Sequence, residues 1–583
     1  MDEPYVAENL LQLGVPLKSK RRLPKNVTSQ PQKTLSGYPI IPYTMGLPKV
    51  IESICPECSK VIPALQYEKD GQVWADKECP EHGKFTDLIY GDAKLYVKME
   101  EMTFGDGVGV SNPNTYAETL CPHDCGLCNR HTSHTALGII DLTNRCDMNC
   151  PVCFANANSA GYLYEMTLEQ VRKMLQTFLN MRPVPCRFVQ FSGGEPTIHP
   201  QFLEIVRMAK EMGFTQIQVA TNGKRLSDPD FCKAAADAGV DTIYFQFDGT
   251  YDDVYQKTRG EHIWEIKQRV VENARKTRMK FVLVPTIVKG INDHQVGDIV
   301  RFAIKNVDVI TGIAFQPVTF TGRINQGERL AKRYTLADLA KDVEVQTGIA
   351  KADADWLPLA CIHPLARLKA ALSGDPTMHV TCHSACSIGT YIFIDPDGVA
   401  HPITRFFNFE GFLKDVDELS RKVSRGPIKL LSKAKVLLAL HRHFDSSKAP
   451  RGLTFDRMLM SAMDGYQDRR LSRDDKEHKR LEYPNMFIAG MHFQDGYNYN
   501  VERVRRCVIH YAAPDGNIYP FCTYNSGPTF RNRIESQFRL SKGEVLKLCE
   551  REGNPPELRR LKRLIEGGHP SCDLISDIPA AGK

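Results

Sequence analysis

The sequence is poor in tryptophan and has no long apolar run. It holds three tryptophans among 583 residues, and no apolar stretch reaches the roughly 18 residues that a membrane-spanning helix requires. The start of the chain shows no basic segment followed by an apolar one, so no secretory signal is predicted. The missing apolar run argues against an integral membrane protein, and the missing signal argues against export. We therefore expect a cytoplasmic protein.

A strong excess of one charge is also missing. The chain has 75 basic and 69 acidic residues, which gives a net charge of +6 at neutral pH. That excess is too small for this length to indicate a nucleic-acid partner, and we expect none. The composition is 42% apolar and 25% charged, as in globular proteins, and the length has room for about three or four domains.

Cysteine, in contrast, is abundant, with 18 residues. In a reducing compartment clustered cysteines are more often metal ligands than disulfides. The clusters divide the chain into five predicted segments. These are an extended arm (1–50), a metal-binding knuckle (51–92), a cysteine-rich cluster-binding segment (93–135), an α/β segment (136–330) and an auxiliary-cluster domain that also faces substrate and membrane (331–583).

The α/β segment alternates short apolar runs with amphipathic stretches of helical periodicity. The apolar runs are 137–142, 187–191, 217–220, 242–247, 280–285 and 312–317. Strand–helix units repeated six times predict neighbouring parallel strands. We expect an α/β fold built as a partial (βα)6 TIM-like barrel, and a flat doubly wound sheet is the alternative.

A cysteine triplet follows the first predicted strand of this segment. Cys146, Cys150 and Cys153 have the spacing C-x3-C-x2-C. Three thiolates on one loop can ligate three irons of a [4Fe–4S] cluster, which leaves the fourth iron free to chelate a cofactor or substrate. A structural zinc ion normally takes four protein ligands, which this triplet does not supply. The spacing therefore predicts a catalytic iron–sulfur cluster.

This triplet, the aromatic Phe154 after it and the sequence Ser192-Gly-Gly-Glu-Pro196 after the second strand resemble the radical S-adenosylmethionine (SAM) superfamily. The resemblance implies that the open iron holds SAM, which is cleaved reductively to a 5′-deoxyadenosyl radical. It also implies a low-potential electron donor such as ferredoxin or flavodoxin. The residues that it assigns to SAM are Phe154, Gly193, Gly194, Glu195, Pro196, Thr221, Asn222, Gln246 and Asp248.

The knuckle contains Cys55, Cys58 and Cys79, a pattern typical of a zinc-ribbon or rubredoxin-like site. Ligand types alone do not separate mononuclear iron from zinc. The fourth ligand is open. His82 is the nearest candidate, and a cysteine between 121 and 128 is the alternative.

Two further cysteine sets suggest auxiliary clusters. Cys121, Cys125 and Cys128 repeat the C-x3-C-x2-C spacing, with His131 a candidate fourth ligand, and the alternative is that they complete the knuckle. Five more cysteines lie far apart in the sequence and resemble the auxiliary [4Fe–4S] regions of other radical SAM enzymes. One cluster needs four ligands, so one of the five is in excess. The five are Cys361, Cys382, Cys386, Cys507 and Cys522.

The order of all these motifs, from residue 55 to 525, resembles the tetraether lipid synthase family. That resemblance implies a phospholipid substrate, hydrogen abstraction at the terminal methyl groups of its tails, and carbon–carbon coupling into membrane-spanning lipids. Residues 427–444 form a basic amphipathic pattern, which suits peripheral contact with the inner membrane face, although an ordinary core-facing helix has the same pattern. The alternative functions are radical modification of a peptide or protein, and zinc binding without catalysis.

Overall fold

The computed structural model describes most of the chain. The described residues are 32–322, 324–374, 376–423, 438, 440–458, 483–527, 530–553, 555, 558–559 and 562–563. Residues 1–31 of the predicted arm, and most of the amphipathic segment 427–444 on which membrane contact was inferred, lie outside them.

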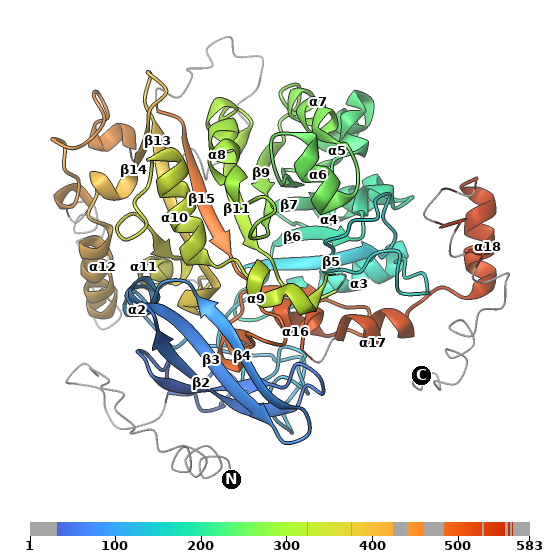
Figure 1. Cartoon of the computed structure of the whole chain (residues 1–583), viewed down its shortest axis with the longest axis horizontal. Helices are drawn as coiled ribbons and strands as arrows, with labels where there is room; N and C mark the ends of the chain where they lie inside the picture. Colours follow the sequence, from blue (N-terminus) through green and yellow to red (C-terminus); the bar gives the residue numbers. More distant parts are fainter. Residues whose placement is uncertain are drawn as a thin grey trace.

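The knuckle forms a four-stranded antiparallel sheet, drawn in blue in Figure 1. Its strands are β1 (Lys49–Ile54), β2 (Val61–Lys69), β3 (Gln72–Cys79) and β4 (Gly83–Tyr90). Asp70 and Gly71 both have positive φ, as a two-residue type I′ turn between β2 and β3 requires. Helix α2 (Ala93–Glu101) follows, and its N-cap Asp92 accepts a hydrogen bond from the backbone N–H of Leu95.

A second, larger sheet forms the body of the molecule. In the described part of the chain its order is β12-β13-β15-β11-β9-β8-β7-β6-β5-β16-β17. The neighbours from β15 to β16 in this order run parallel. The six predicted strands lie in its centre, so the predicted parallel α/β arrangement is confirmed. They are β5 (Leu137–Thr143), β6 (Phe188–Gly193), β7 (Gln216–Thr221), β8 (Thr242–Gln246), β9 (Lys280–Val284) and β11 (Ile310–Pro317).

The remaining strands are mostly short and come largely from the C-terminal half. They are β10 (Thr286–Ile287), β12 (Leu357–Pro358), β13 (Ser387–Ile394), β14 (Ala400–Pro402), β15 (Asn485–Met491), β16 (Ile509–Ala512) and β17 (Ile518–Pro520). Because β15 and β16 extend the parallel strands at either side, the predicted boundary at residue 330 divides one continuous sheet. The outermost strands β12 and β17 are its edges, so the sheet is open.

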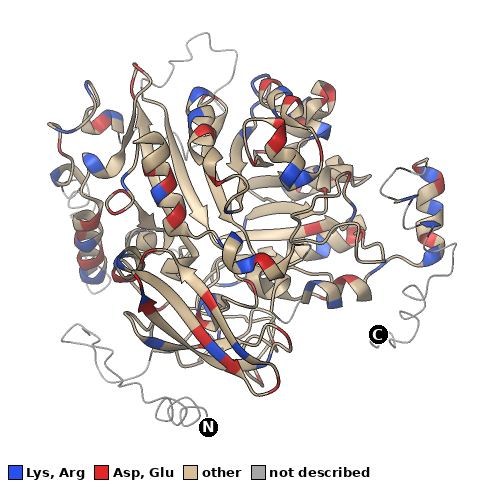
Figure 2. Cartoon of the chain, in the orientation of Figure 1, with Lys and Arg blue, Asp and Glu red and all other residues tan. Residues whose placement is uncertain are grey.

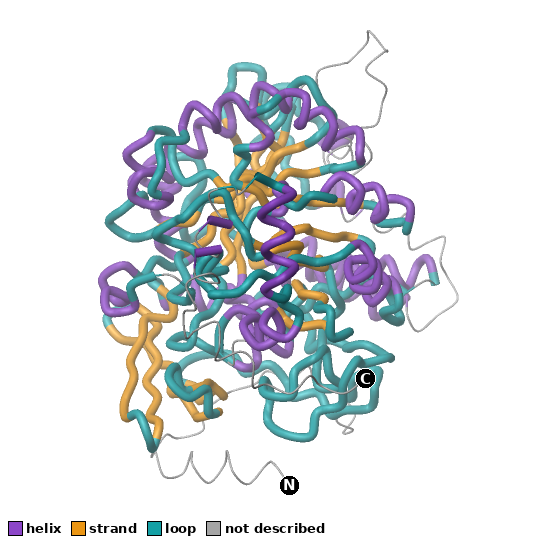
Figure 3. The backbone as a smooth tube through the Cα atoms, turned by 90° about the vertical axis from the view of Figure 1, so that its right-hand side faces the viewer, coloured by secondary structure: helices purple, strands orange, loops and turns teal. Residues whose placement is uncertain are grey.

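Helices lie on the outside of the strands (Figure 3). The connections within the parallel region contain α3 (Leu168–Leu179), α4 (Phe202–Glu211), α5 (Pro229–Ala238), α6 (Asp252–Arg259), α7 (Trp264–Ala274), α8 (Val296–Lys305), α9 (Arg329–Lys332) and α10 (Leu336–Thr347). The later helices are α11 (His363–Ser373), α12 (Phe409–Val423), α15 (Val501–Arg505), α16 (Phe521–Asn525), α17 (Phe530–Gln537) and α18 (Lys542–Arg551).

Helix α3 illustrates why these segments are helical. Its buried residues Val171, Met174, Leu175 and Phe178 follow the three- and four-residue spacing of one helix face. Thr167 and Gln170 form a capping box at its start. In the described residues no helix combines the length and the apolar character needed to cross a bilayer. Acidic and basic residues alternate along α12 (Figure 2), where Glu410–Lys414 and Glu418–Lys422 are ion pairs one turn apart.

A buried charge cluster joins the N-terminal sheet to the body. The fully buried Arg333 pairs with Asp495, with 2.6 Å between Nη1 and Oδ2, and with Asp87 of β4. Lys77 of β3 donates from Nζ to the carbonyl oxygen of Gly496 at 2.6 Å. Burial lowers the pKa of Lys77 to about 8. These buried charges have partners both in the N-terminal sheet and in the body of the molecule, so they fix the position of the sheet on the body.

Replacing Arg333 by methionine leaves the buried carboxylate of Asp495 without its ion-pair partner and removes one of the two arginines that pair with Asp87. We expect Arg333→Met to lower the free energy of unfolding by about 3–5 kcal/mol, measured by chemical denaturation. The control is Arg269→Met, which removes an ion pair whose side chains are 53% and 84% exposed, and which should change stability by less than about 0.5 kcal/mol. Equal losses in the two variants would contradict a role for the buried cluster.

Candidate active site

A cavity of about 740 Å³ lies against the C-terminal ends of β5 to β8. It is lined from strands at both sides of the parallel region, so the sheet curves around it. Of the residues that the sequence assigns to the cluster and SAM, those in the lining are Cys146, Cys150, Cys153, Phe154, Gly193, Gly194, Glu195, Thr221, Asn222 and Gln246. Pro196, which begins a short 3-10 helix, and Asp248 do not line it.

Asn158 holds the loop that carries the cysteine triplet, here called the cluster loop (residues 144–158). The backbone N–H of Cys146 donates to its Oδ1 at 3.0 Å. Its Nδ2 donates to the carbonyl oxygens of Cys146 at 2.7 Å and Met148 at 3.1 Å. Asn158 has φ of 62°, a left-handed conformation that asparagine adopts more readily than most residues. The sequence motifs did not point to this residue, because an isolated asparagine gives no sign of its partner.

Arg259, at the end of α6, supports the other side of the cluster loop. It donates from Nη1 to the carbonyl oxygen of Val152 at 3.1 Å, between Cys150 and Cys153. Asp248 is fully buried and pairs with Arg259, at 3.0 Å between Nη2 and Oδ1. Burial raises the pKa of the Cys150 thiol, and the charge of Arg259 opposes that rise. Asp248, which the resemblance assigned to SAM, contacts Arg259 instead of lining the cavity.

The two glycines of the Gly-Gly-Glu-Pro turn are needed because the turn touches the end of β5 and the start of the cluster loop. A Cβ on Gly193 would lie 2.2 Å from the carbonyl oxygen of Thr143, and one on Gly194 would lie 2.0 Å from that of Arg145. The N–H groups of Gly194 and Glu195 donate to the same two carbonyl oxygens, each at 2.8 Å. No side chain fits between these backbones, so the turn and the loop keep one relative position.

Glu195 is already hydrogen-bonded within the protein. Its Oε1 accepts from the hydroxyls of Thr197 at 2.6 Å and Thr221 at 2.8 Å, and its Oε2 accepts from the backbone N–H of Asn222 at 2.8 Å. Burial and then the neighbouring Asp147 raise its pKa to about 7. These contacts tie the turn after β6 to the end of β7. They make Glu195 a positioning residue, in addition to the contact with SAM that the resemblance implied.

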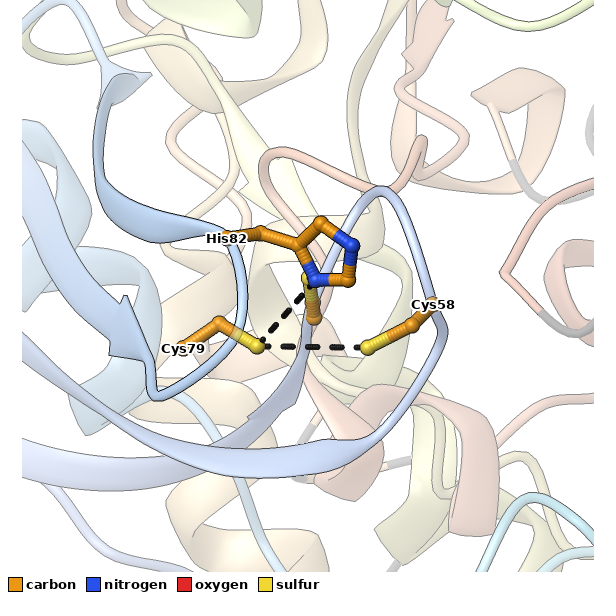
Figure 4. A group of neighbouring side chains, drawn as sticks. Cys58, Cys79 and His82 are labelled. Atoms are coloured by element: carbon orange, nitrogen blue, oxygen red, sulfur yellow. Dashed lines mark hydrogen bonds between the residues drawn. The ribbon is translucent and has the colours of Figure 1, made fainter.

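The N-terminal sheet carries a second site, shown in Figure 4. Cys55, Cys58, Cys79 and His82 bring their ligand atoms within 4.8 Å of one another. The separation is 3.9 Å between the sulfurs of Cys58 and Cys79, and 3.5 Å from Cys79 Sγ to His82 Nδ1. A tetrahedral ion with metal–sulfur bonds of about 2.3 Å has edges of about 3.8 Å. The four groups therefore fit one mononuclear metal ion, and His82 is the fourth member of the set.

The triplet Cys121, Cys125 and Cys128 lies close to the C-terminal cysteines. Cys125 and Cys507 both pack against an aromatic group that includes Tyr511 and Phe521. The Nε2 of His131, the candidate fourth ligand, is hydrogen-bonded to the carbonyl oxygen of Cys507 at 2.8 Å and lies 3.2 Å from the Nε2 of His510. Only the Nδ1 of His131 remains for a metal.

The five C-terminal cysteines also come together from distant parts of the sequence. Charge repulsion from Cys386, Cys507 and Cys361 adds to burial in raising the pKa of the Cys382 thiol. Arg503 donates from Nε to the sulfur of Cys386 at 3.4 Å, and Cys522 Sγ accepts from the N–H of Gln494 at 3.4 Å. Of these five cysteines Cys361 alone is in the lining of the cavity.

Comparison with known proteins agrees with this geometry. The model of the radical SAM superfamily matches residues 140–303, and the model of the HMPTM N-terminal zinc ribbon domain matches residues 47–91. The 7,8-dihydro-6-hydroxymethylpterin dimethyltransferase of Methanocaldococcus jannaschii is 41% identical over 84% of this chain and 95% of its own length. This chain belongs to the radical SAM superfamily and to the family of that dimethyltransferase. The predicted [4Fe–4S] cluster, SAM and mononuclear metal of such an enzyme are thereby supported.

Other similarities are more distant. A probable GTP 3′,8-cyclase of Thermococcus kodakarensis is 29% identical over 29% of this chain and 54% of its own length. Among solved structures, Streptococcus suis SuiB has a TM-score of 0.31 at 16% identity and covers 37% of this chain and 47% of its own.

The prediction of lipid-tail coupling is wrong. A relative that matches 84% of this chain is a dimethyltransferase of a pterin, so neither the specific resemblance to tetraether lipid synthase nor the phospholipid substrate is supported. The physical reason is that cysteine spacing specifies metal ligands and carries no information about the substrate. Non-catalytic zinc binding is likewise excluded by the membership of a family of radical SAM enzymes.

Loss of the Asn158 side chain should loosen the cluster loop. At about 1 kcal/mol for each net hydrogen bond, Asn158→Gly removes three bonds and should release iron measurably faster from the reconstituted protein under a chelator. Glycine keeps the positive φ. The matched control is Asn156→Gly, which also has positive φ, at 51°, and makes none of these bonds. Equal iron retention in both variants would rule out this role for Asn158.

The mononuclear site should lose its metal independently of the cluster. We expect Cys79→Ser to abolish the metal bound by the N-terminal sheet, because it removes one of four ligands. Elemental analysis should show that the iron held by the cysteine triplet stays. Glu81→Gln, at an exposed neighbour that pairs with Lys60, is the control and should keep both metals. Retention of the first metal in Cys79→Ser would show that another ligand set holds it.

Proposed function

We propose that the protein is a radical SAM methyltransferase that acts on a reduced pterin of the 7,8-dihydro-6-hydroxymethylpterin type. The observation that supports this most is the 41% identity to the dimethyltransferase over 84% of the chain. The zinc ribbon model at residues 47–91 and the radical SAM model at residues 140–303 also match this chain, in agreement with such an enzyme. The enzyme needs an electron donor, since radical SAM cleavage is reductive, and a ferredoxin or flavodoxin suits that requirement.

The cysteine triplet is proposed to hold the [4Fe–4S] cluster, with SAM in the cavity beside it. When bound, this pair supplies a radical for hydrogen abstraction, and SAM also supplies methyl groups. The chain's own residues hold these groups in place. Asn158 and Arg259 fix the cluster loop, and the turn at Gly193 and Gly194 rests on it. Phe154 lines the cavity with its ring centroid 5.8 Å from that of Phe521, which helps to exclude water.

The remaining cysteines are proposed as ligands of auxiliary clusters. Cys121, Cys125 and Cys128 would supply three ligands of one cluster. Four of the five C-terminal cysteines would hold another, and Cys361 is the member that faces the cavity. The thiols need not lie within the span of a single ion, because each thiolate of a cube binds its own iron. The buried surroundings of both sets favour clusters shielded from solvent.

A labelling assay tests the reaction. Anaerobic, reconstituted enzyme with a reductant, methyl-deuterated SAM and 7,8-dihydro-6-hydroxymethylpterin should yield a pterin that carries the label, detected by mass spectrometry. Cys150→Ala should give no labelled product, because it removes one iron ligand. Formation of 5′-deoxyadenosine without any labelled pterin would contradict the proposed substrate. Labelled peptide in its place would favour the peptide-modifying alternative.

A further inference from the structure

Four uncharged polar side chains form a surface inside the cavity, here called the polar floor. They are Gln190 of β6, Gln218 of β7, Tyr244 of β8 and Gln316 of β11, and all four line the cavity. We propose that the polar floor recognises a neutral heterocyclic ring through a lactam-type edge, in which a carbonyl and an N–H stand side by side. This inference rests on the proposed function and names the surface that selects its substrate.

Gln190 and Gln218 are the first pair of the polar floor. They are register partners on neighbouring parallel strands, so their side chains lie on the same side of the sheet. Gln218 Nε2 donates to Gln190 Oε1 at 2.5 Å. Within the described residues neither the amide nitrogen of Gln190 nor the carbonyl oxygen of Gln218 has a protein partner. Reversing both amides leaves the same outcome, one free carbonyl and one free NH2 next to each other.

Tyr244 and Gln316 are the second pair. Gln316 Nε2 donates to the hydroxyl oxygen of Tyr244 at 3.1 Å. That bond uses the tyrosine as acceptor, so its own proton and the carbonyl oxygen of Gln316 remain for a ligand. Burial raises the pKa of Tyr244 to about 12, which keeps the phenol protonated as a donor at neutral pH. The second pair therefore also offers one donor and one acceptor.

The charges of the cavity favour a neutral ring. Glu195 and Arg259 are the carboxylate and guanidinium in its lining. Glu195 accepts from the backbone N–H of Asn222 after β7, and Arg259 donates to the carbonyl oxygen of Val152 in the cluster loop. The polar floor itself carries no charge, so an anionic group there would be desolvated without a counter-charge. A hydrocarbon would leave two donors and two acceptors unpaired, each at a cost. A neutral ring with alternating donors and acceptors satisfies all of them.

Binding of 7,8-dihydro-6-hydroxymethylpterin to the SAM-loaded, unreduced holoenzyme tests this proposal. The variants are Gln218→Met, which keeps the length of the side chain, and Tyr244→Phe, which removes one oxygen atom. Each should weaken binding about tenfold, since the ligand loses a hydrogen bond and its partner is left unpaired. The control is Gln216→Met, the same change on β7 two residues earlier and outside the cavity lining, which should bind like the unaltered protein.

Unchanged affinity in both variants, equal weakening in the control, or no binding of the pterin to the unaltered enzyme would overturn the proposal. The iron content of the reconstituted protein should match among all variants, which shows that the folded cluster site is intact. The two claims fail separately. If the variants weaken pterin binding but the unaltered enzyme transfers no methyl group, the proposed reaction is wrong and recognition by the polar floor is retained. If methyl transfer occurs but the variants bind the pterin normally, the proposed reaction is retained and recognition by the polar floor is wrong.

Discussion

The backbone contact between the Gly193–Gly194 turn and the cluster loop is the constraint on which the site depends. The two backbones are so close that a single Cβ would lie about 2 Å from a carbonyl oxygen. A loop that carries three metal ligands is otherwise free to move, because loops contain few internal hydrogen bonds. Pinning it to the end of a neighbouring parallel strand gives the three sulfurs one geometry, as an iron–sulfur cube requires.

Other parts of the molecule reinforce this contact from different sides. Asn158 donates a hydrogen bond to the carbonyl oxygen of Cys146 within the cluster loop. Arg259 of α6, which pairs with Asp248, supports the loop from outside. A Cβ on Gly322, which follows β11, would lie 2.5 Å from the carbonyl oxygen of Cys153. The C-terminal strands β15 and β16 then extend the sheet on both sides and bring the later cysteines near the cavity. The C-terminal cysteines are thus positioned by long-range strand pairing.

The sequence predicted well those features that follow from local patterns. The six parallel strands were recognised because each is a short apolar run next to an amphipathic helix, and the cysteine triplet and Gly-Gly-Glu-Pro meet at one cavity because parallel strands end at the same edge. Strands β15 and β16 were missed as members of this sheet, since short strands far along the chain have no periodicity that links them to β11 or β5. Asn158 and Arg259 were missed because an isolated polar residue gives no sign of its partner.

The substrate was the feature least accessible from sequence. Cysteine order specifies how many metals a chain can hold, whereas substrate choice depends on side chains such as Gln190 and Gln218, which are separated by a helix and meet only in the folded sheet. The amphipathic segment 427–444, which suggested membrane contact, has the same pattern as any helix with one apolar face. Its pattern therefore could not distinguish membrane contact from packing against the protein core.

Cys146, Cys150 and Cys153 are expected to hold a [4Fe–4S] cluster with one iron open to SAM. Low-temperature electron paramagnetic resonance of the reduced, reconstituted protein tests it directly, with the other cysteine sets replaced by alanine. Adding SAM should change the cluster's spectrum, because the amino and carboxylate groups of SAM bind the open iron. A spectrum that is identical with and without SAM would show that no iron of this cluster is open to SAM.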